Sequence, residues 1–285
     1  MTKPFVLSLP DMPTTPLVFS SPHSGSSYPA EFLATAILDP MEIRSSEDAF
    51  VDSLFSGATR YGAPLIAATL PRAYVDLNRA ADELDPALIV GARRRGANPR
   101  VSAGLGVIPR VVAEGRTIRE GKIPLREAVK RLRTGYHPYH EQLQTMLDDQ
   151  RAKFGQAILV DCHSMPHDAL TSAPLVSGKP PSIILGDRFG ASCARWIIDA
   201  ATDLFMEQGF SVARNAPFAG GYITQHYGRP SRGIHALQVE IDRGIYMDER
   251  RLKKRDTFAA VQARIDRVIE GLAAIGDASL PMAAE

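Results

Sequence analysis

The sequence predicts a single three-layer α/β/α domain with a central mixed, largely parallel sheet. Two kinds of segment predict it: short apolar runs bounded by Pro or Gly, typical of buried strands, and longer runs with apolar residues at steps of three or four, typical of helices. The two kinds alternate along the chain, which favours helices on both faces of a sheet. The 285 residues are 45% hydrophobic, enough for one large core. We therefore expect one domain over residues 1–285, with its core over about 16–273.

Apolar runs that end in polar residues predict the strands of this sheet. The run "AILVDCHS" is continuous, as in a strand buried on both faces, and the others are shorter or alternate less cleanly. The predicted strands cover residues 16–21, 64–70, 157–164, 182–187 and 233–242.

Three long periodic segments predict helices. Residues 123–150 carry an apolar stripe that Pro138 is expected to kink or divide. Residues 191–208 stop at Gly209, a common helix end, and residues 248–276 carry a third stripe. A shorter amphipathic segment covers residues 49–59, and residues 277–285 are expected to form a frayed tail.

Composition argues against several classes of protein. The formal net charge of +1 is too small to attract nucleic acid or an anionic membrane by long-range electrostatics. Two cysteines are too few for a disulfide framework. No signal peptide, membrane-spanning run, Walker motif or dinucleotide fingerprint is found, so we expect a cytoplasmic protein. The basic residues 91–100 form either a solvated loop or a guide for an anionic substrate.

Two histidines follow predicted strands at the sheet edge where sites of α/β proteins lie. His23 comes directly after "LVFSSP", and His163 lies in "VDCHS", two residues after Asp161. A strand-end histidine near a carboxylate suits zinc, because the carboxylate fixes the imidazole tautomer. Either histidine alone could instead be structural, but two at one edge favour a metal site.

A catalytic zinc needs a third protein ligand, and "RSSEDAF" offers Glu47 and Asp48. The same residues could cap the helix that follows, so one acid could cap while the other binds the metal.

Two further segments carry groups suited to a carboxylate substrate. "PRAYVDLNRA" contains Arg72, Asn78 and Arg79, whose alternative role is a surface ion-pair loop. "AGGYITQHYGRP" brings polar groups into a glycine-rich loop where a ligand can approach the backbone. Its candidate substrate-binding residues are Gly221, His226 and Arg229.

Glu240 lies near the end of a predicted strand and is the candidate general base for a metal-activated water. Its alternative partner is Arg243 at the surface. The other reactive residues fit structural roles better, although His167 could contact a metal ligand and orient it. The residues set aside as structural are His137, His140, Cys162, Ser164 and His235.

Together these motifs resemble the N-formylglutamate amidohydrolase family. "SSPHSG", "SEDAFVDSLF", "PRAYVDLNR", "VDCHSMP" and "GGYITQHYGRPSRGIHALQVEI" occur in order between about residues 16 and 248. The resemblance implies a fold similar to that of zinc carboxypeptidases (phosphorylase/hydrolase-like) and aspartoacylases, and one Zn²⁺ per chain. It also implies cleavage of N-formyl-L-glutamate to formate and L-glutamate, a step of amino-acid catabolism in histidine degradation.

The resemblance also implies a role for each candidate residue. His23, Asp48 and His163 match the metal ligands, with Glu47 as the alternative acid. Glu240 matches the base and Arg72 the group that polarises the scissile carbonyl. Asn78 and Arg79 match the residues that hold the substrate carboxylate, and Arg229 is expected to help them.

Two other functions stay open. Residues 82–121 depart from the pattern expected around a formylglutamate pocket, so the substrate could be another N-acyl or N-formimino amino acid. A non-catalytic protein that binds small dicarboxylates is a second alternative, which the presence of His23, His163 and Glu240 argues against. The expected partner is a small-molecule substrate, bound by a monomer or small homo-oligomer.

Overall fold

The computed structural model of the chain describes residues 3–93 and 96–278. They form two compact units, each built from three separate stretches of the chain. The first unit comprises Met1–Val6, Pro22–Ala49 and Ala67–Gln142, and the second comprises Leu7–Ser21, Phe50–Ile66 and Leu143–Glu285.

A seven-stranded sheet runs in the order β1-β3-β2-β6-β9-β7-β8. Strands β2, β6 and β9 pair in parallel, β9 pairs antiparallel with β7, and β7 pairs in parallel with β8. The predicted mixed, largely parallel sheet is therefore confirmed. Its strands are β1 (Phe5–Ser8), β2 (Leu17–Ser21), β3 (Leu65–Ala68), β6 (Ala157–Met165), β7 (Ile183–Gly186), β8 (Val212–Arg214) and β9 (Ile234–Asp242).

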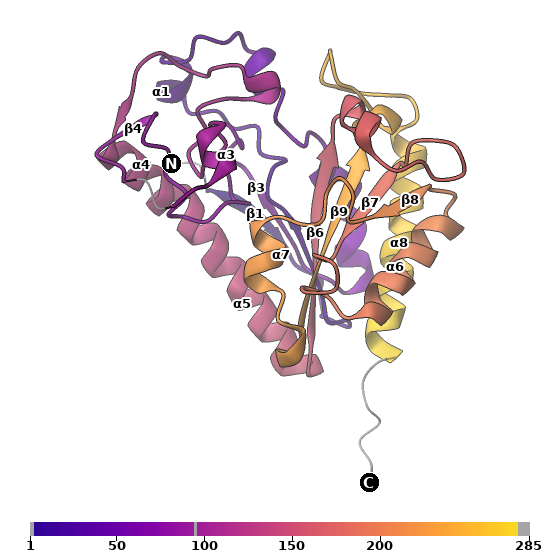
Figure 1. Ribbon diagram of the computed structural model, residues 1–285. Helices are drawn as coiled ribbons and strands as arrows, with labels where there is room; N and C mark the ends of the chain where they lie inside the picture. Colours follow the sequence, from indigo (N-terminus) through magenta and orange to yellow (C-terminus); the bar gives the residue numbers. More distant parts are fainter. Residues whose placement is uncertain (1–2, 94–95, 279–285) are drawn as a thin grey trace. The chain divides into compact units, whose positions relative to one another are not determined.

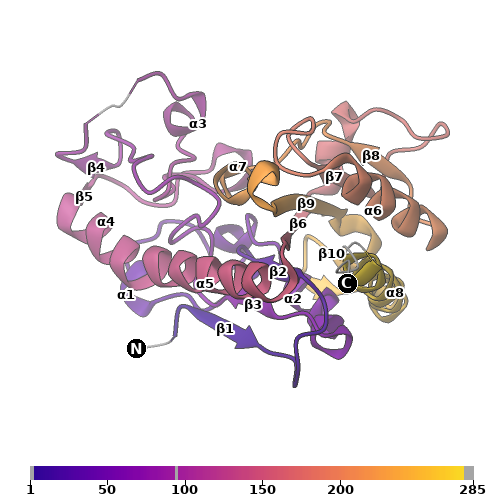
Figure 2. The same cartoon turned by 90° about the horizontal axis from the view of Figure 1, so that it is seen from below.

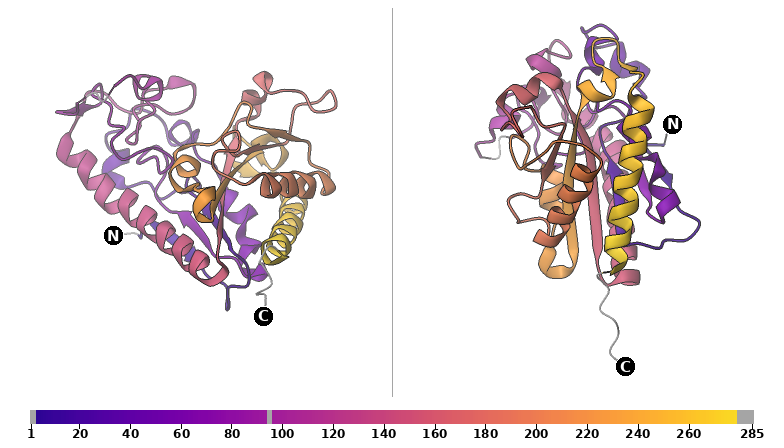
Figure 3. Two further views of the ribbon diagram at one scale, coloured as in Figure 1. Left: turned by 60° about the horizontal axis from the view of Figure 1, so that its bottom comes forward. Right: turned by 90° about the vertical axis from the view of Figure 1, so that its right-hand side faces the viewer.

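Helices of the second unit cover both faces of its strands (Figure 2). On one face lie α2 (Val51–Leu54), α6 (Arg195–Glu207) and α8 (Phe258–Ala278), with α6 packed beside α8 (Figure 3). On the other face, α7 (Tyr222–Tyr227) contacts β6 and β9. Strands β6 and β9 lie side by side (Figure 1). Because both faces are covered, every residue of these two strands is buried.

The first unit is built mostly from short elements and the long loops between them. In its core the Arg131 guanidinium lies over the rings of Phe32 and Tyr74, 5.2 and 4.4 Å from their centroids. Arg131 also bonds to Glu127 at 3.0 Å, so this buried cation has an anionic partner. The elements of this unit are α1 (Ala30–Leu33), β4 (Ile89–Val90), α3 (Pro99–Ser102), β5 (Ile123–Pro124) and α4 (Leu125–Arg131).

The helix predicted over residues 123–150 is divided, but before Pro138 rather than at it. Helix α4 passes into a π-helical turn, Leu132–Tyr136, and α5 (His137–Phe154) follows. Pro138 is the second residue of α5. It has no N–H to donate and its ring would crowd the carbonyl of Thr134, so the wider turn precedes it.

Two predicted helices begin later than expected. Helix α6 begins at Arg195 because its N-cap residue Ala194 is extended, with ψ of 144°, and because Ser192 is hydrogen-bonded to Ala236 of β9 instead of entering the helix. Helix α8 begins at Phe258 because the charged residues before it form a small hairpin in which Leu252 has φ of 48°. Its strands are β10 (Met247–Asp248) and β11 (Lys253–Lys254).

The segment predicted as one amphipathic helix over residues 49–59 is α2 followed by a 3₁₀ segment, Ser56–Tyr61. Of the predicted tail, residues 279–285 lie outside the described residues, and residues 277–278 end α8. Among the described residues, every helix is too short or too polar to cross a membrane.

Candidate active site

His23 is held between two carboxylates in the first unit. Its Nε2 lies 2.8 Å from Asp76 Oδ1, and its Nδ1 lies 3.4 Å from Asp48 Oδ2. The backbone N–H of Asp48 donates to the His23 carbonyl at 3.0 Å, which ties the two residues together. All three side chains are buried. The contact with Asp76 fixes which imidazole nitrogen faces Asp48.

Glu47, the alternative metal ligand, has a different environment. It accepts from Arg44 Nε at 2.9 Å and from the Tyr28 hydroxyl at 2.7 Å. Burial and the neighbouring Glu47 carboxylate raise the pKa of Tyr28 above its usual range, so this hydroxyl stays a donor. The N-cap residue of α2 is Phe50, which makes no capping hydrogen bond with its side chain. The structure therefore places Asp48, and not Glu47, beside His23.

Asp76 joins His23 to the segment expected to bind carboxylates. Its Oδ2 accepts from Arg72 Nε at 3.0 Å, and its Oδ1 accepts from the backbone N–H of Asn78 at 2.8 Å. Burial alone raises the pKa of the Asp76 carboxyl, but the charges of Arg72, His23 and Arg79 outweigh it and hold that pKa well below its usual range. Sequence reasoning gave Asp76 no role, because its contacts become visible only in the fold.

Arg79 is buried and partly engaged with the backbone. Its Nε donates to the Leu105 carbonyl at 2.9 Å, and its Nη1 donates to the Asn78 carbonyl at 3.0 Å. Burial lowers the pKa of its guanidinium, although Asp76 opposes the shift. The Tyr136 hydroxyl donates a hydrogen bond to the Arg79 carbonyl at 2.8 Å. Because Asp76, Asn78 and Arg79 are buried, the segment is not the surface ion-pair loop that was the alternative prediction.

His163 and Glu240 lie opposite each other on adjacent strands of the second unit. They are register partners in the parallel pair β6–β9. His163 Nε2 lies 2.9 Å from Asp161 Oδ2, two residues earlier on the same face of β6. Both strands run two residues beyond these positions, so the two side chains stand on the strands and not in the loops after them.

The Glu240 carboxylate is buried and accepts from Gln238 Nε2 at 2.8 Å through Oε1. Gln238 in turn accepts from the backbone N–H of Gly221 at 2.8 Å. Arg243, the alternative partner of Glu240, donates to Ser164 Oγ at 3.1 Å and lies 3.8 Å from Glu249. The sequence places an amide, Gln238, two residues before the candidate base, and this spacing is the signal for the bond between them.

His226 and Arg229 are exposed at the end of α7. The His226 ring stacks on Tyr222 with centroids 5.0 Å apart. Partial desolvation and the charge of Arg229 lower the pKa of His226. Arg229 Nη1 donates to the carbonyls of Gln225 and Gly228. It therefore supplies hydrogen bonds to carbonyls at the C-terminal end of α7, and its charged guanidinium is exposed to solvent.

Two of the histidines set aside as structural, His140 and His235, have local partners. His140 Nε2 contacts the Leu77 carbonyl at 3.0 Å, and His235 Nδ1 accepts from the Ala194 N–H at 3.3 Å. His167 Nδ1 lies 3.0 Å from Asp242 Oδ2, and this contact raises the pKa of His167. Burial raises the pKa of Cys162 well above its usual range, which argues against a thiolate nucleophile.

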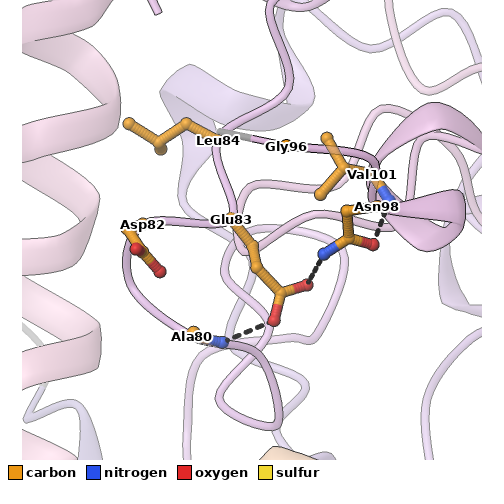
Figure 4. A pocket seen from close by; sticks show the side chains of 7 residues that line it. All are labelled: Ala80, Asp82, Glu83, Leu84, Gly96, Asn98 and Val101. Carbon is orange, nitrogen blue, oxygen red and sulfur yellow. Dashed lines mark hydrogen bonds between the residues drawn. The ribbon is translucent and has the colours of Figure 1, made fainter. Parts of the chain in front are cut away.

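A pocket of about 220 Å³ lies within the first unit (Figure 4). Glu83 accepts from the Ala80 N–H at 3.1 Å and from Asn98 Nδ2 at 3.2 Å, so it supports the pocket wall. Apart from Ala80, the lining residues of the pocket fall in residues 82–121, the segment that departs from the expected pattern. Its lining residues are Ala80, Asp82, Glu83, Leu84, Gly96, Asn98 and Val101.

Comparison with known proteins agrees with the motifs. A family model described as N-formylglutamate amidohydrolase matches residues 15–247. The chain is 34% identical over 274 residues to an N-formylglutamate deformylase of Pseudomonas putida, covering 92% of this chain and 93% of that one. It is 32% identical over 277 residues to the enzyme of the same name from Pseudomonas aeruginosa, covering 92% and 94%.

A crystal structure of N-formylglutamate amidohydrolase from Ralstonia eutropha JMP134 has the same fold. The TM-score is 0.90 at 34% sequence identity, and the match covers 96% of this chain and 99% of that one. The agreement extends over nearly the full length of both chains. The chain therefore belongs to the N-formylglutamate amidohydrolase family of enzymes.

Proposed function

We propose that the protein is a zinc-dependent amidohydrolase that cleaves N-formyl-L-glutamate to formate and L-glutamate. The main support for this proposal is that His163, a candidate metal ligand, and Glu240, a candidate base, are register partners on β6 and β9. The relatives named N-formylglutamate deformylase support the choice of substrate.

The proposed metal ligands are His23, Asp48 and His163. Two imidazoles and one carboxylate form a donor set suited to catalytic zinc, and we propose that these three side chains hold one ion. Chain connectivity supports the grouping, because β2 lies beside β6 with Ser20 opposite Asp161, and His23 follows Ser20 by three residues. When bound, zinc would polarise the scissile carbonyl and bring the pKa of a water toward neutrality.

Asp76 and Asp161 prepare the two histidines for this role. Each carboxylate contacts the Nε2 of its histidine, which leaves Nδ1 as the nitrogen to coordinate a metal. For His23 that nitrogen is the one that faces Asp48. The residues present therefore fit a zinc ion.

Glu240 takes a proton from the attacking water and returns it to the nitrogen of the leaving glutamate. Arg72 is proposed to stabilise the negative charge that develops on the formyl oxygen. Its guanidinium is held at Nε by Asp76, so its position is fixed before the substrate arrives.

The remaining candidates are proposed to bind the amino-acid part of the substrate. Asn78 and Arg79 in the first unit, together with Arg229 in the second, hold the glutamate carboxylates. Gly221 and His226 flank the substrate from the loop and helix that precede Arg229. We expect the enzyme to act in the cytoplasm in histidine degradation, as a monomer or small homo-oligomer without nucleic-acid or membrane partners.

The substrate is tested by measuring product release from a matched panel. N-formyl-L-glutamate, N-formimino-L-glutamate, N-acetyl-L-glutamate and N-formyl-L-leucine separate the acyl group from the side-chain carboxylate. The proposal predicts the highest kcat/KM with N-formyl-L-glutamate. A higher value with N-formimino-L-glutamate would support the alternative substrate, and no turnover of any member by zinc-loaded protein would support a non-catalytic binding protein.

A further inference from the structure

Gln238 links the candidate base to a glycine-rich loop in the second unit. Its Nε2 donates to Glu240 Oε1 at 2.8 Å, and its Oε1 accepts from the backbone N–H of Gly221 at 2.8 Å. Gln238 and Glu240 are two residues apart on β9, so both side chains project from the same face. We infer that Gln238 is a positioning residue that holds the Glu240 carboxylate in the orientation required for proton transfer.

The direction of the Gln238 amide follows from its two partners. A backbone N–H can only donate, so the oxygen of the amide must face Gly221. The NH₂ group then faces Glu240, whose carboxylate can accept from it. The opposite orientation would place the NH₂ group against the Gly221 N–H, two donors together. Gln238 is therefore held in a single orientation, and one oxygen of Glu240 is held with it.

The Gly221 N–H is itself held by close packing of its loop on β7. The Ala219 carbonyl accepts from the Arg188 N–H at 2.8 Å. Gly186, the last residue of β7, lacks the Cβ that would lie only 2.7 Å from the Ala219 carbonyl carbon. Thr224 Oγ1 donates to the Gly221 carbonyl at 2.9 Å. These contacts hold the loop in place. The Gly221 N–H therefore fixes the position of the Gln238 amide, and the amide fixes one oxygen of Glu240.

The consequence for catalysis follows from geometry. A buried carboxylate with one oxygen bound in a fixed direction presents its other oxygen in a fixed direction. Loss of the Gln238 donor would remove a contact that orients the carboxylate, and small misplacements of catalytic groups cost up to about 10²-fold in rate. The inference rests on the proposed function, because it requires that Glu240 be the base.

The test compares two variants of Gln238 with one control. Gln238→Met keeps the length of the side chain without its polar atoms. Gln238→Glu keeps an acceptor for the Gly221 N–H but removes the donor to Glu240. Gln262→Met is the control, because Gln262 also donates an amide hydrogen bond, to the Ser53 carbonyl at 2.7 Å, in the same unit. For each protein we would measure kcat, KM and bound zinc.

The expected result is a fall in kcat of about 10- to 100-fold for both Gln238 variants. KM should stay within about twofold and zinc content unchanged, because Gln238 is proposed to touch neither substrate nor metal. The control should keep the wild-type kcat. Wild-type kcat in Gln238→Met would overturn the inference. If Gln238→Met fails to fold, wild-type kcat in Gln238→Glu, which sets a second carboxylate against Glu240, would overturn the inference in its place.

A double-mutant cycle shows whether Gln238 acts through Glu240. In a Glu240→Ala background, Gln238→Met should cause no further loss of the residual kcat. The same loss in both backgrounds would overturn the positioning role while leaving the proposed function intact. Full activity of Glu240→Ala alone would instead refute Glu240 as the base, and the proposed mechanism would fail with it.

Discussion

His163 on β6 and Glu240 on β9 are register partners in a parallel pair, with backbones one strand spacing apart. Because β6 and β9 are buried along their whole length, neither side chain can change its neighbour without loss of register. The geometry therefore couples a candidate metal ligand to a candidate base through two buried, paired strands of the second unit.

Replacement of the base should reduce turnover without removing the metal. We expect Glu240→Gln to lower kcat by at least about 10²-fold, because the amide cannot accept the proton. Zinc content, measured by atomic absorption, should equal that of the wild type. Glu270→Gln is a matched control, since Glu270 is exposed on α8 and pairs with Arg267. Near-full turnover of Glu240→Gln would remove its assigned role.

The two neighbouring acids should differ in what they support. Asp48→Ala should lose zinc, because Asp48 is the acid that lies beside His23. Glu47→Ala should keep zinc but lower the free energy of unfolding by about 1–3 kcal/mol, since Arg44 and Tyr28 lose a buried acceptor. Metal analysis and denaturant unfolding of both proteins check this. Unchanged zinc in Asp48→Ala would contradict the ligand assignment.

Asp76 should tune the affinity for metal through His23. We expect Asp76→Asn to weaken zinc binding by about 10- to 100-fold, because a carboxylate partner orients a histidine ligand and makes it more basic. Competition with a chromophoric chelator measures this without reference to activity. Asp82→Asn, an exposed acid in the same segment, is the control. Equal affinities in Asp76→Asn and the wild type would show that His23 needs no such partner.

His167 should make a small, pH-dependent contribution to stability. Its bond to Asp242 raises the pKa of His167 above the ordinary value of about 6.5. A raised pKa means that the contribution is complete below about pH 6.5 and is lost as the pH rises through the folded-state value. The Tm difference between wild type and His167→Gln should therefore be larger at pH 5.5 than at pH 9. A difference independent of pH would contradict this.

The central strands were predictable because a few consecutive residues are enough to identify each of them as a buried strand. The runs that form β2, β6 and β9 are apolar, uninterrupted and closed by polar residues, as strands buried on both faces require. The edge strands β1 and β8 were missed, since four and three residues are too few to carry a pattern. The late starts of α6 and α8 depend on the extended backbone at Ala194 and the positive φ at Leu252, which periodicity cannot indicate.

The candidate site was predictable in its residue types but not in its partners. His23 and His163 stand out as histidines that follow apolar runs. Whether Glu47 or Asp48 faces His23 depends on Arg44 and Tyr28, which reach Glu47 only once the first unit is folded. The single-domain prediction and the likeness to zinc carboxypeptidases stay predictions.

The central claim is that one zinc ion, held by His23, Asp48 and His163, is required for release of formate from N-formyl-L-glutamate. The most direct test removes the metal by chelation and restores zinc stepwise while formate is measured. We predict that chelated protein is inactive and that activity rises to a plateau at one zinc per chain. Formate release that survives complete removal of the metal would contradict the claim.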